Sequence, residues 1–268
     1  MFGFCRDRFA KELLARGYSL VALPDAGIRP LQILARDGRS LSLYGDLASA
    51  FDAGDKPLPA VKNGTQVAPI SVTETSALDN RLGLRVVSQW LGGDKAGVSG
   101  RIKQAARFKL KLGDVTKDAI DLQELDQFLA AASLRAGAPN IERLLEHDNL
   151  YVITAVLKSK SLSLETTTDD MVDGNLNIPE VVQGTSGSAR VEVINKDKRT
   201  VAFKAESPVV FAFKAALIYF EDDSYASLHP LRKDLPLLGG PDNEPVPQET
   251  GWLCDQVGAG FSRFAGGL

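Results

Sequence analysis

The sequence predicts an α+β protein with a twisted, mainly antiparallel sheet and flanking helices. Strand-like and helix-like segments are interspersed without a regular strand–helix–strand repeat, which disfavours a parallel sheet. The turn pair Asp37-Gly38 separates two short apolar runs, as expected for a hairpin. Several later segments alternate apolar and polar residues with a period of two, the pattern of strands that expose one face.

The composition limits the classes of protein that the chain can belong to. With 268 residues, 44% of them hydrophobic and 24% charged, it is a folded globular protein of one large domain or two small ones. A net charge of -3 lacks the basic excess of nucleic-acid-binding surfaces, so we expect no nucleic-acid partner. Two cysteines cannot form a secreted disulfide framework, and we expect a reducing cytoplasm. Neither a signal peptide nor an apolar run long enough for a membrane-spanning helix is expected.

The first half of the chain supplies a helix and several strands. Apolar residues at helical spacing precede Gly17, a natural helix stop, and a short apolar strand follows it. Glycine and proline make residues 52–68 loop-like. The remaining segments that we expect to be strands are 31–34, 40–44, 67–73 and 82–90.

The second half begins with a helical period over residues 114–134, ended by Gly137 and Pro139. Asn140 is a good capping residue, so we expect a second helix to start there. The later segments that we expect to be strands are 151–164, 189–194, 200–205 and 209–220.

A basic strand is the most informative segment. From Arg101 to Leu112 cations occupy one face and mainly apolar residues the other, and the basic face consists of Arg101, Lys103, Arg107, Lys109 and Lys111. One interpretation is an ordinary half-buried or edge strand guarded by lysines. The other is a strand that lines a membrane pore, since about 9–11 residues with one apolar face suffice to cross a bilayer.

The C-terminal part differs from the rest in composition. Residues 236–251 are rich in proline and glycine and are expected to form an exposed, protease-sensitive linker, with candidate cleavage positions at Leu237, Leu238, Asp242 and Glu244. Residues 252–268 then carry apolar anchors that recur every few residues. These are Trp252, Leu253, Val257, Phe261, Phe264 and Leu268. Such a short segment cannot fold alone, so we expect it to dock onto residues 1–235.

The sequence offers little that resembles an enzyme. His147 and His229 are the only histidines, and we expect both to have structural or surface roles. Ligand spacing for zinc is absent, as are both glycine-rich nucleotide-binding patterns, so we expect no metal and no cofactor. The enzyme alternative is a thiol hydrolase that uses Cys5 with His147.

The N-terminal sequence resembles the start of the gasdermin pore-forming domain. Met1-Phe2 is followed by Phe9-Ala10-Lys11-Glu12, by Gly17 and by an apolar strand, in the order found in gasdermins. The basic strand and the segment 150–160 are similar to the strands of that family's two membrane-inserting hairpins. Animal gasdermins have a helical repressor domain at the position of residues 236–268. This short segment instead resembles the inhibitory peptide of bacterial gasdermins.

The resemblance implies an autoinhibited pore former rather than an enzyme. An activating protease would remove the peptide 252–268, and the freed body 1–235, a monomer until then, would assemble with copies of itself into a large β-barrel in the inner membrane. Cell death in anti-phage defence is the implied outcome, and the protein is expected in the cytoplasm until cleavage. The resemblance further implies that Cys5 is palmitoylated. The neighbouring cations Arg6 and Arg8 favour the reactive thiolate form of Cys5. The alternative is a soluble binding or scaffold module whose tail completes its core.

Overall fold

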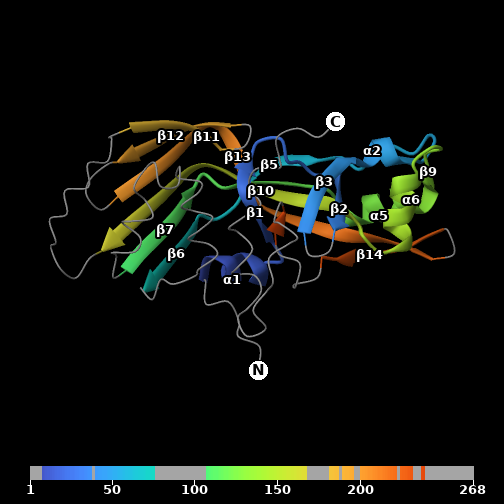
Figure 1. The fold of residues 1–268 in the computed structure, drawn as a ribbon, viewed down its shortest axis with the longest axis horizontal. Helices are drawn as coiled ribbons and strands as arrows, with labels where there is room; N and C mark the ends of the chain where they lie inside the picture. The colour runs from blue at the N-terminus through green and yellow to red at the C-terminus, as the bar shows by residue number, and fades with distance from the viewer. Residues whose placement is uncertain are drawn as a thin grey trace, which may run out of the picture.

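The computed structural model describes residues 8–37, 40–75, 107–167, 181–186, 189–195, 200–221, 224–231 and 237–238. Most of them belong to one large sheet with a few helices, drawn in Figure 1. The helices are α1 (Arg8–Ala15), α2 (Leu47–Ala50), α5 (Leu122–Ala131) and α6 (Pro139–Glu146). The strands are β1 (Ser19–Asp25), β2 (Gln32–Asp37), β3 (Ser40–Asp46), β4 (Phe51–Asp52), β5 (Lys62–Gln66), β6 (Ile70–Thr75), β7 (Arg107–Gly113), β8 (Thr116–Ala119), β9 (Ser133–Leu134), β10 (Leu150–Thr167), β11 (Val181–Ser186), β12 (Ala189–Asn195), β13 (Thr200–Glu221), β14 (Ser224–Pro230) and β15 (Leu237–Leu238).

Six strands close into a ring in the order β10–β13–β1–β15–β3–β2, because β2 pairs with β10. Every pair in this ring is antiparallel except the two made by β15. Leu237 and Leu238 pair in parallel with Leu20 and Val21 of β1, and Leu238 also pairs with Leu41 of β3. A strand of two residues from the end of the described chain therefore lies between two strands from its beginning.

The long strands β10 and β13 carry the hydrophobic core on both of their faces. Tyr151 and Ile153 of β10 belong to one buried cluster, together with Phe213 of β13. Leu150 and Val152 alternate with them and belong to a second cluster, which α5 and α6 cover. The uninterrupted apolar sequence of this part of β10 follows from burial on both sides.

Short local signals fix the helix ends. Gly17 follows α1 with φ of +76°, a conformation that glycine adopts without strain, and this confirms the predicted stop. Asp121 caps α5 by accepting hydrogen bonds from the backbone N–H groups of Gln123 (2.9 Å) and Glu124 (3.4 Å).

The ends of β10 and β13 that lie away from the helices form a separate part of the sheet. We call it the distal sheet: β6, β7 as far as Leu112, β11 and β12, with residues 161–167 of β10 and 200–204 of β13. Figure 1 shows it on the left, whereas α2, α5 and α6 lie at the right-hand end. We call the remaining part of β10 and β13, together with β5 and β8, the proximal sheet.

Several sequence predictions need correction. Residues 116–119 form β8 and α5 starts only after Asp121, because the edge of β10 offers these residues a strand partner. Asn140 does not cap α6, which begins one residue earlier with Pro139 as its first residue. Within the expected loop, residues 62–66 form β5 by pairing with β8, and the runs 200–205 and 209–220 join into the single strand β13. The expected strand 82–90 lies outside the described residues.

No helix within the described ranges is both long enough and apolar enough to cross a membrane. The hairpin expected around residues 37 and 38 is confirmed by the antiparallel pairing of β2 with β3.

Candidate functional site

The distal sheet has two chemically different faces, and β7 shows both. Leu110 and Leu112 are buried, with exposed fractions of 4% and 2%, whereas Lys109 and Lys111 between them are exposed. The structure thus confirms the period-two alternation of the basic strand for these residues. Arg107 opens β7 opposite Thr75 of β6.

Neighbouring strands extend the polar face of the distal sheet. Lys111 lies between Ser71 of β6 and Ser163 of β10, so its cross-strand neighbours are hydroxyl side chains. Lys109 lies opposite Glu165, which is also exposed. The face is therefore less uniformly basic than β7 alone suggests, because the register of β10 adds a carboxylate beside Lys109.

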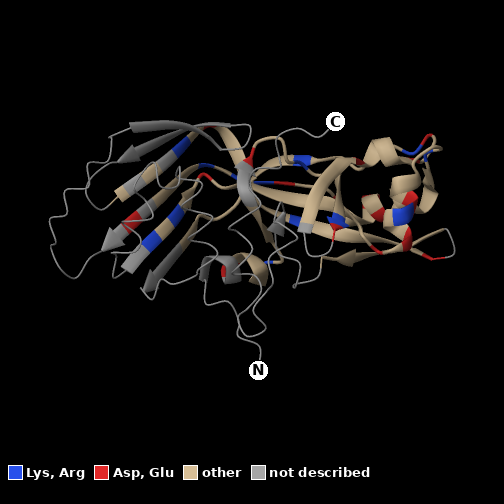
Figure 2. Ribbon diagram, viewed as in Figure 1, with Lys and Arg blue, Asp and Glu red and all other residues tan. Residues whose placement is uncertain are grey.

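One exposed cation on this face comes from a strand that the sequence analysis did not connect with it. Lys204 of β13 lies opposite Ser161 of β10, and Ser161 lies opposite Gly113, the last residue of β7. Lys204 therefore shares the face of Lys109 and Lys111, and Figure 2 shows basic positions in blue on β7 and β13 at the left. Only the pairing register reveals this, since the two strands are remote in sequence.

Where its side chains are described on β6, β7 and β10, the opposite face of the distal sheet is apolar and buried. Ile70 of β6 and Leu162 of β10 are buried together with Leu110 and Leu112, and the register places all four on one side. Helix α1 packs against both β1 and β6, and Figure 1 shows it next to these strands. A sheet with this division has a solvent-exposed cationic face, and it would expose an apolar face if the segments packed on that face moved away.

A buried ion pair lies where the proximal sheet begins. Lys158 of β10 contacts Asp118 of β8, with side-chain exposed fractions of 24% and 5%. Asp118 also accepts a hydrogen bond of 2.8 Å from the backbone N–H of Gly64 in β5. Lys158 interrupts the apolar face of β10 in the sequence, and its acidic partner from another strand explains how the core tolerates it.

A second half-buried lysine lies where α1 joins β1. The Lys214 ammonium lies 4.5 Å from the ring centre of Tyr18, an arrangement that favours a cation–π interaction. Burial and, to a smaller extent, the neighbouring charge of Lys117 lower the pKa of Lys214. Burial raises the pKa of the Tyr18 hydroxyl, and Arg16 partly opposes that change.

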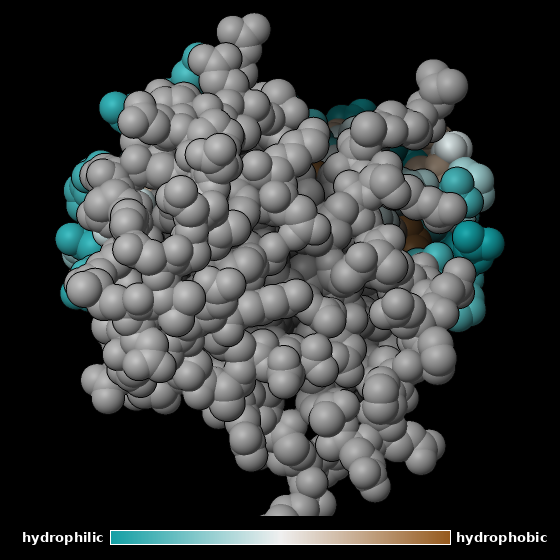
Figure 3. Space-filling view, turned by 60° about the vertical axis from the view of Figure 1, so that its left-hand side comes forward, coloured by the Kyte–Doolittle hydropathy of each residue, from teal (hydrophilic) through white to brown (hydrophobic). Residues whose placement is uncertain are grey.

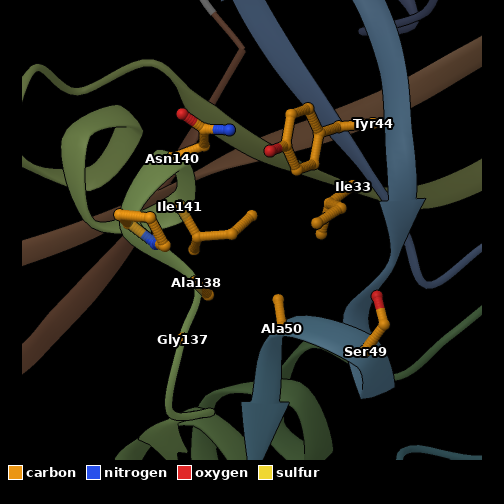
Figure 4. A pocket seen from close by; sticks show the side chains of 9 residues that line it. Ile33, Tyr44, Ser49, Ala50, Gly137, Ala138, Asn140 and Ile141 are labelled. Atoms are coloured by element: carbon orange, nitrogen blue, oxygen red, sulfur yellow. The ribbon is translucent and has the colours of Figure 1, made fainter. Parts of the chain in front are cut away.

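A cavity of about 220 Å³ lies between the ends of β2 and β3, α2 and the start of α6. Figure 4 shows Tyr44 and Ile33 on one side and Asn140 and Ile141 on the other, with Ser49 of α2 below. Of its lining residues only Tyr44 carries a titratable group. The cavity lies in the helical part of the molecule, away from the two-faced distal sheet.

The described surface is mostly hydrophilic in the view of Figure 3, where little hydrophobic colour is visible among the described residues. The large hydrophobic side chains that the described part of the chain exposes are Tyr44, Leu58 and Leu122.

Most of the sequence-predicted site residues lie outside the described ranges. They are Cys5, Arg101, Lys103, Asp242, Glu244, Trp252, Leu253, Val257, Phe261, Phe264 and Leu268. Leu237 and Leu238 are described, and they form β15, in which Leu237 pairs with one neighbouring strand and Leu238 with two. The division into body, linker and peptide stays a prediction.

The two histidines make local contacts. His147 Nδ1 lies 2.8 Å from the carbonyl oxygen of Arg143 at the end of α6, and His229 Nε2 lies 2.9 Å from the Ser227 hydroxyl. Within the described residues, no group of three or more potential metal ligands comes together.

Comparison with known proteins agrees with this architecture. The family model described as "Bacterial Gasdermin Family" matches residues 21–226. A "Gasdermin bGSDM" of a Desulfuromonadales bacterium is 31% identical over 232 residues, covering 85% of this chain and 87% of the relative. A "Gasdermin bGSDM" of Lysobacter enzymogenes is 29% identical and covers 84% of each chain.

A solved structure shares the fold at low sequence identity. The structure of a bacterial gasdermin from Bradyrhizobium tropiciagri superposes with a TM-score of 0.56 at 15% identity, covering 87% of this chain and 95% of that one. The match of the family model to most of the chain and the 31% identical relative together show that the protein belongs to the bacterial gasdermins, a family of pore-forming proteins and not of enzymes.

Proposed function

We propose that this gasdermin is held inactive by its C-terminal segment and that proteolysis of residues 239–251 activates it. The freed bodies then assemble into a large β-barrel in the inner membrane and kill the cell, in a defence against phage. The two-faced distal sheet supports the proposal, because Leu110 and Leu112 alternate with Lys109 and Lys111 along β7. Strands of membrane β-barrels require this alternation of lipid-facing and water-facing residues. Strands in lipid must satisfy their backbone groups, and many copies in a closed ring would do so.

The position of β15 supports inhibition by the C-terminal segment. Its two residues complete the ring between β1 and β3, which have no direct pairing with each other among the described strands. A parallel strand this short is marginal by itself and depends on the attached chain to remain in place. Cutting the linker would turn an intramolecular contact into a bimolecular one and lower the effective concentration of the peptide.

Controlled cleavage tests the proposal. A recognition site for a specific protease replaces part of residues 239–251, and dye release is measured from vesicles that contain phosphatidylglycerol. We expect release only after cleavage, together with large oligomers on the vesicles. A matched chain with a scrambled site controls for the insertion. A cut protein that stays monomeric and leaves the vesicles intact contradicts the proposal and favours a soluble binding module.

The site of the cut gives a second comparison. Cleavage after Asp242 or Glu244 leaves β15 attached to the body, whereas a site placed before Leu237 separates β15 from it. If β15 takes part in inhibition, the second cut activates at least as strongly as the first. Weaker activation by the second cut would contradict a role for β15.

We also propose that Cys5 carries a palmitoyl group in a thioester. One acyl chain is a marginal anchor, so it would assist insertion and not replace it. Intact mass of protein expressed in its own host decides this, with Cys5→Ala as the control. A mass without the acyl increment contradicts the proposal.

A further inference from the structure

Four neighbouring strands are interrupted at one level of the sheet. β5 ends at Gln66 and β6 starts at Ile70, while β7 ends at Gly113 and β8 starts at Thr116. β10 and β13 continue through this level, but their pairing is irregular there. We call this line the seam: residues 67–69, 113–115, 159–160 and 205–208. The seam separates the distal sheet from the proximal sheet. In Figure 1 the distal sheet lies on the left, and the proximal sheet lies towards the right.

The irregularity is largest between β10 and β13. Ser159 pairs with Val209 and Ser161 pairs with Lys204, so residues 205–208 of β13 lie opposite Lys160 alone. The inserted stretch includes Pro208, which has no backbone N–H to donate to a ladder. Between the neighbouring strands β7 and β8, Asp114 has φ of +49°, which is unusual for a residue other than glycine. Bulges of this kind bend a strand locally.

The packing changes abruptly across the seam. On its proximal side residues 150–157 of β10 are all buried, so both faces are covered. On its distal side Leu162 is buried, whereas Ser161 and Ser163 are half-exposed and Lys160 is exposed. Among the residues whose exposure is described, the distal part of β10 therefore buries fewer side chains than its proximal part, and local opening favours regions with fewer buried contacts.

A buried hydroxyl group holds the seam together. The Ser159 side chain is 3% exposed, and its oxygen lies 2.6 Å from the carbonyl oxygen of Gly113 and 2.8 Å from that of Ser161. It donates to one of these carbonyls at a time and accepts a 3.1 Å hydrogen bond from the Ser161 N–H. The Val67 N–H adds a 3.0 Å bond to the Val115 carbonyl on the next strand pair.

We propose that the seam is a hinge, about which the distal sheet turns against the proximal sheet, and that Ser159 holds it in the angle seen here. The Lys158–Asp118 pair anchors β10 to β8 directly on the proximal side. Helix α1 contacts β1 in the ring and β6 in the distal sheet, and it therefore connects the ring to the distal sheet. The use of this hinge in pore opening rests on the proposed function, whereas its existence does not.

Hydrogen–deuterium exchange of the intact chain in solution, without lipid, tests the hinge. The distal amides in β7, in residues 161–165 of β10 and in residues 201–204 of β13 should exchange as one block. The proximal amides of residues 150–157 and 211–218 should be clearly slower, with the boundary at the seam. A gradual change in exchange along β10 and β13, with no boundary at residues 159–160 and 205–208, would overturn the proposal. This comparison needs no variant.

Ser159→Ala adds a directed test, with Ser163→Ala in the same strand as the matched control. Loss of the buried hydroxyl should raise exchange in the distal block about tenfold and leave the proximal block unchanged. Ser163→Ala should change neither. Equal acceleration of both blocks, or no acceleration in the distal block, means that Ser159 supports the core in general and overturns the hinge.

The role in pore opening has its own measurement. Once cleaved, Ser159→Ala should release vesicle dye several-fold faster than cleaved wild type, because the distal sheet turns more easily. An unchanged or slower rate overturns this role. If cleaved wild type releases no dye at all, the proposed function fails, and the exchange result still decides whether the hinge exists.

Discussion

Lys158 of β10 and Asp118 of β8 form an ion pair that lies mostly out of solvent and joins two strands next to the seam. Asp118 is the more buried partner, with 5% of its side chain exposed, and the Gly64 N–H supplies a further hydrogen bond to it. Removing one partner of such a pair leaves an uncompensated charge, which costs more than the pair contributes.

Lys158→Met should therefore lower the free energy of unfolding by about 2–4 kcal/mol, because Asp118 stays buried without its cation. The double variant Lys158→Met/Asp118→Asn should recover part of this loss, since the amide oxygen can still accept from Gly64. Urea unfolding measures both changes. Lys160→Met, at an exposed lysine two residues away in the same strand, is the control and should change stability by less than about 0.5 kcal/mol. Equal effects at positions 158 and 160 would contradict this account.

The exposed lysines of β7 should contribute to lipid binding and not to folding. Each lysine close to an anionic membrane contributes about 1 kcal/mol, so the double variant Lys109→Gln/Lys111→Gln should weaken binding of the cleaved protein to phosphatidylglycerol vesicles by about 30-fold. The effect should shrink at high salt. Vesicle co-sedimentation measures it, with Lys56→Gln/Lys62→Gln, exposed lysines outside the distal sheet, as the control. The interpretation fails if both double variants bind alike.

The hydrogen bond from the Tyr225 hydroxyl to Asp126 should make stability depend on pH in alkaline solution. Burial, the hydrogen bond to Asp126 and the charge of that carboxylate raise the pKa of Tyr225 well above its ordinary value of 10.0. The unfolded chain thus loses this proton near pH 10 while the folded chain keeps it, so the contribution is complete below pH 10 and declines above it.

Tyr225→Phe removes this contribution. The difference in unfolding free energy between wild type and Tyr225→Phe should be constant up to about pH 9 and should fall as the pH rises past 10. Tyr18, whose pKa is also raised, contributes a pH dependence of the same sign to the unfolding free energy, and Lys214 contributes one of the opposite sign. Both contributions are the same in wild type and Tyr225→Phe, so they cancel in the difference. A difference that grows above pH 10 would show the sign to be wrong.

The cap of α5 gives a local stability prediction. Asp121→Ala removes the acceptor of the Gln123 and Glu124 N–H groups and should cost about 1 kcal/mol. Asp121→Asn keeps an oxygen in place and should cost much less. Thermal unfolding of the two variants makes the comparison. Equal losses would mean that the charge of Asp121, and not its hydrogen bonds, stabilises the helix.

Local sequence signals predicted those elements that depend on few neighbours. The helix before Gly17, the hairpin of β2 and β3 and the alternation of β7 were predicted because each is encoded within a few consecutive residues. The resemblance to gasdermins, based on the order of such pieces, is confirmed by the family match. The start of α5 was misplaced, because β10 offers residues 116–119 a strand partner that no local pattern reveals.

The sequence by itself determined the period-two pattern that gives the distal sheet a cationic face and an apolar face, since side chains alternate along any strand. Only the tertiary structure decided which strands lie side by side. It placed Lys204 and Glu165 beside the lysines of β7, gave Lys158 its partner Asp118, and set β15 between β1 and β3. These relationships depend on pairing between segments far apart in the chain, and register between such segments is fixed by packing of the whole core rather than by local composition.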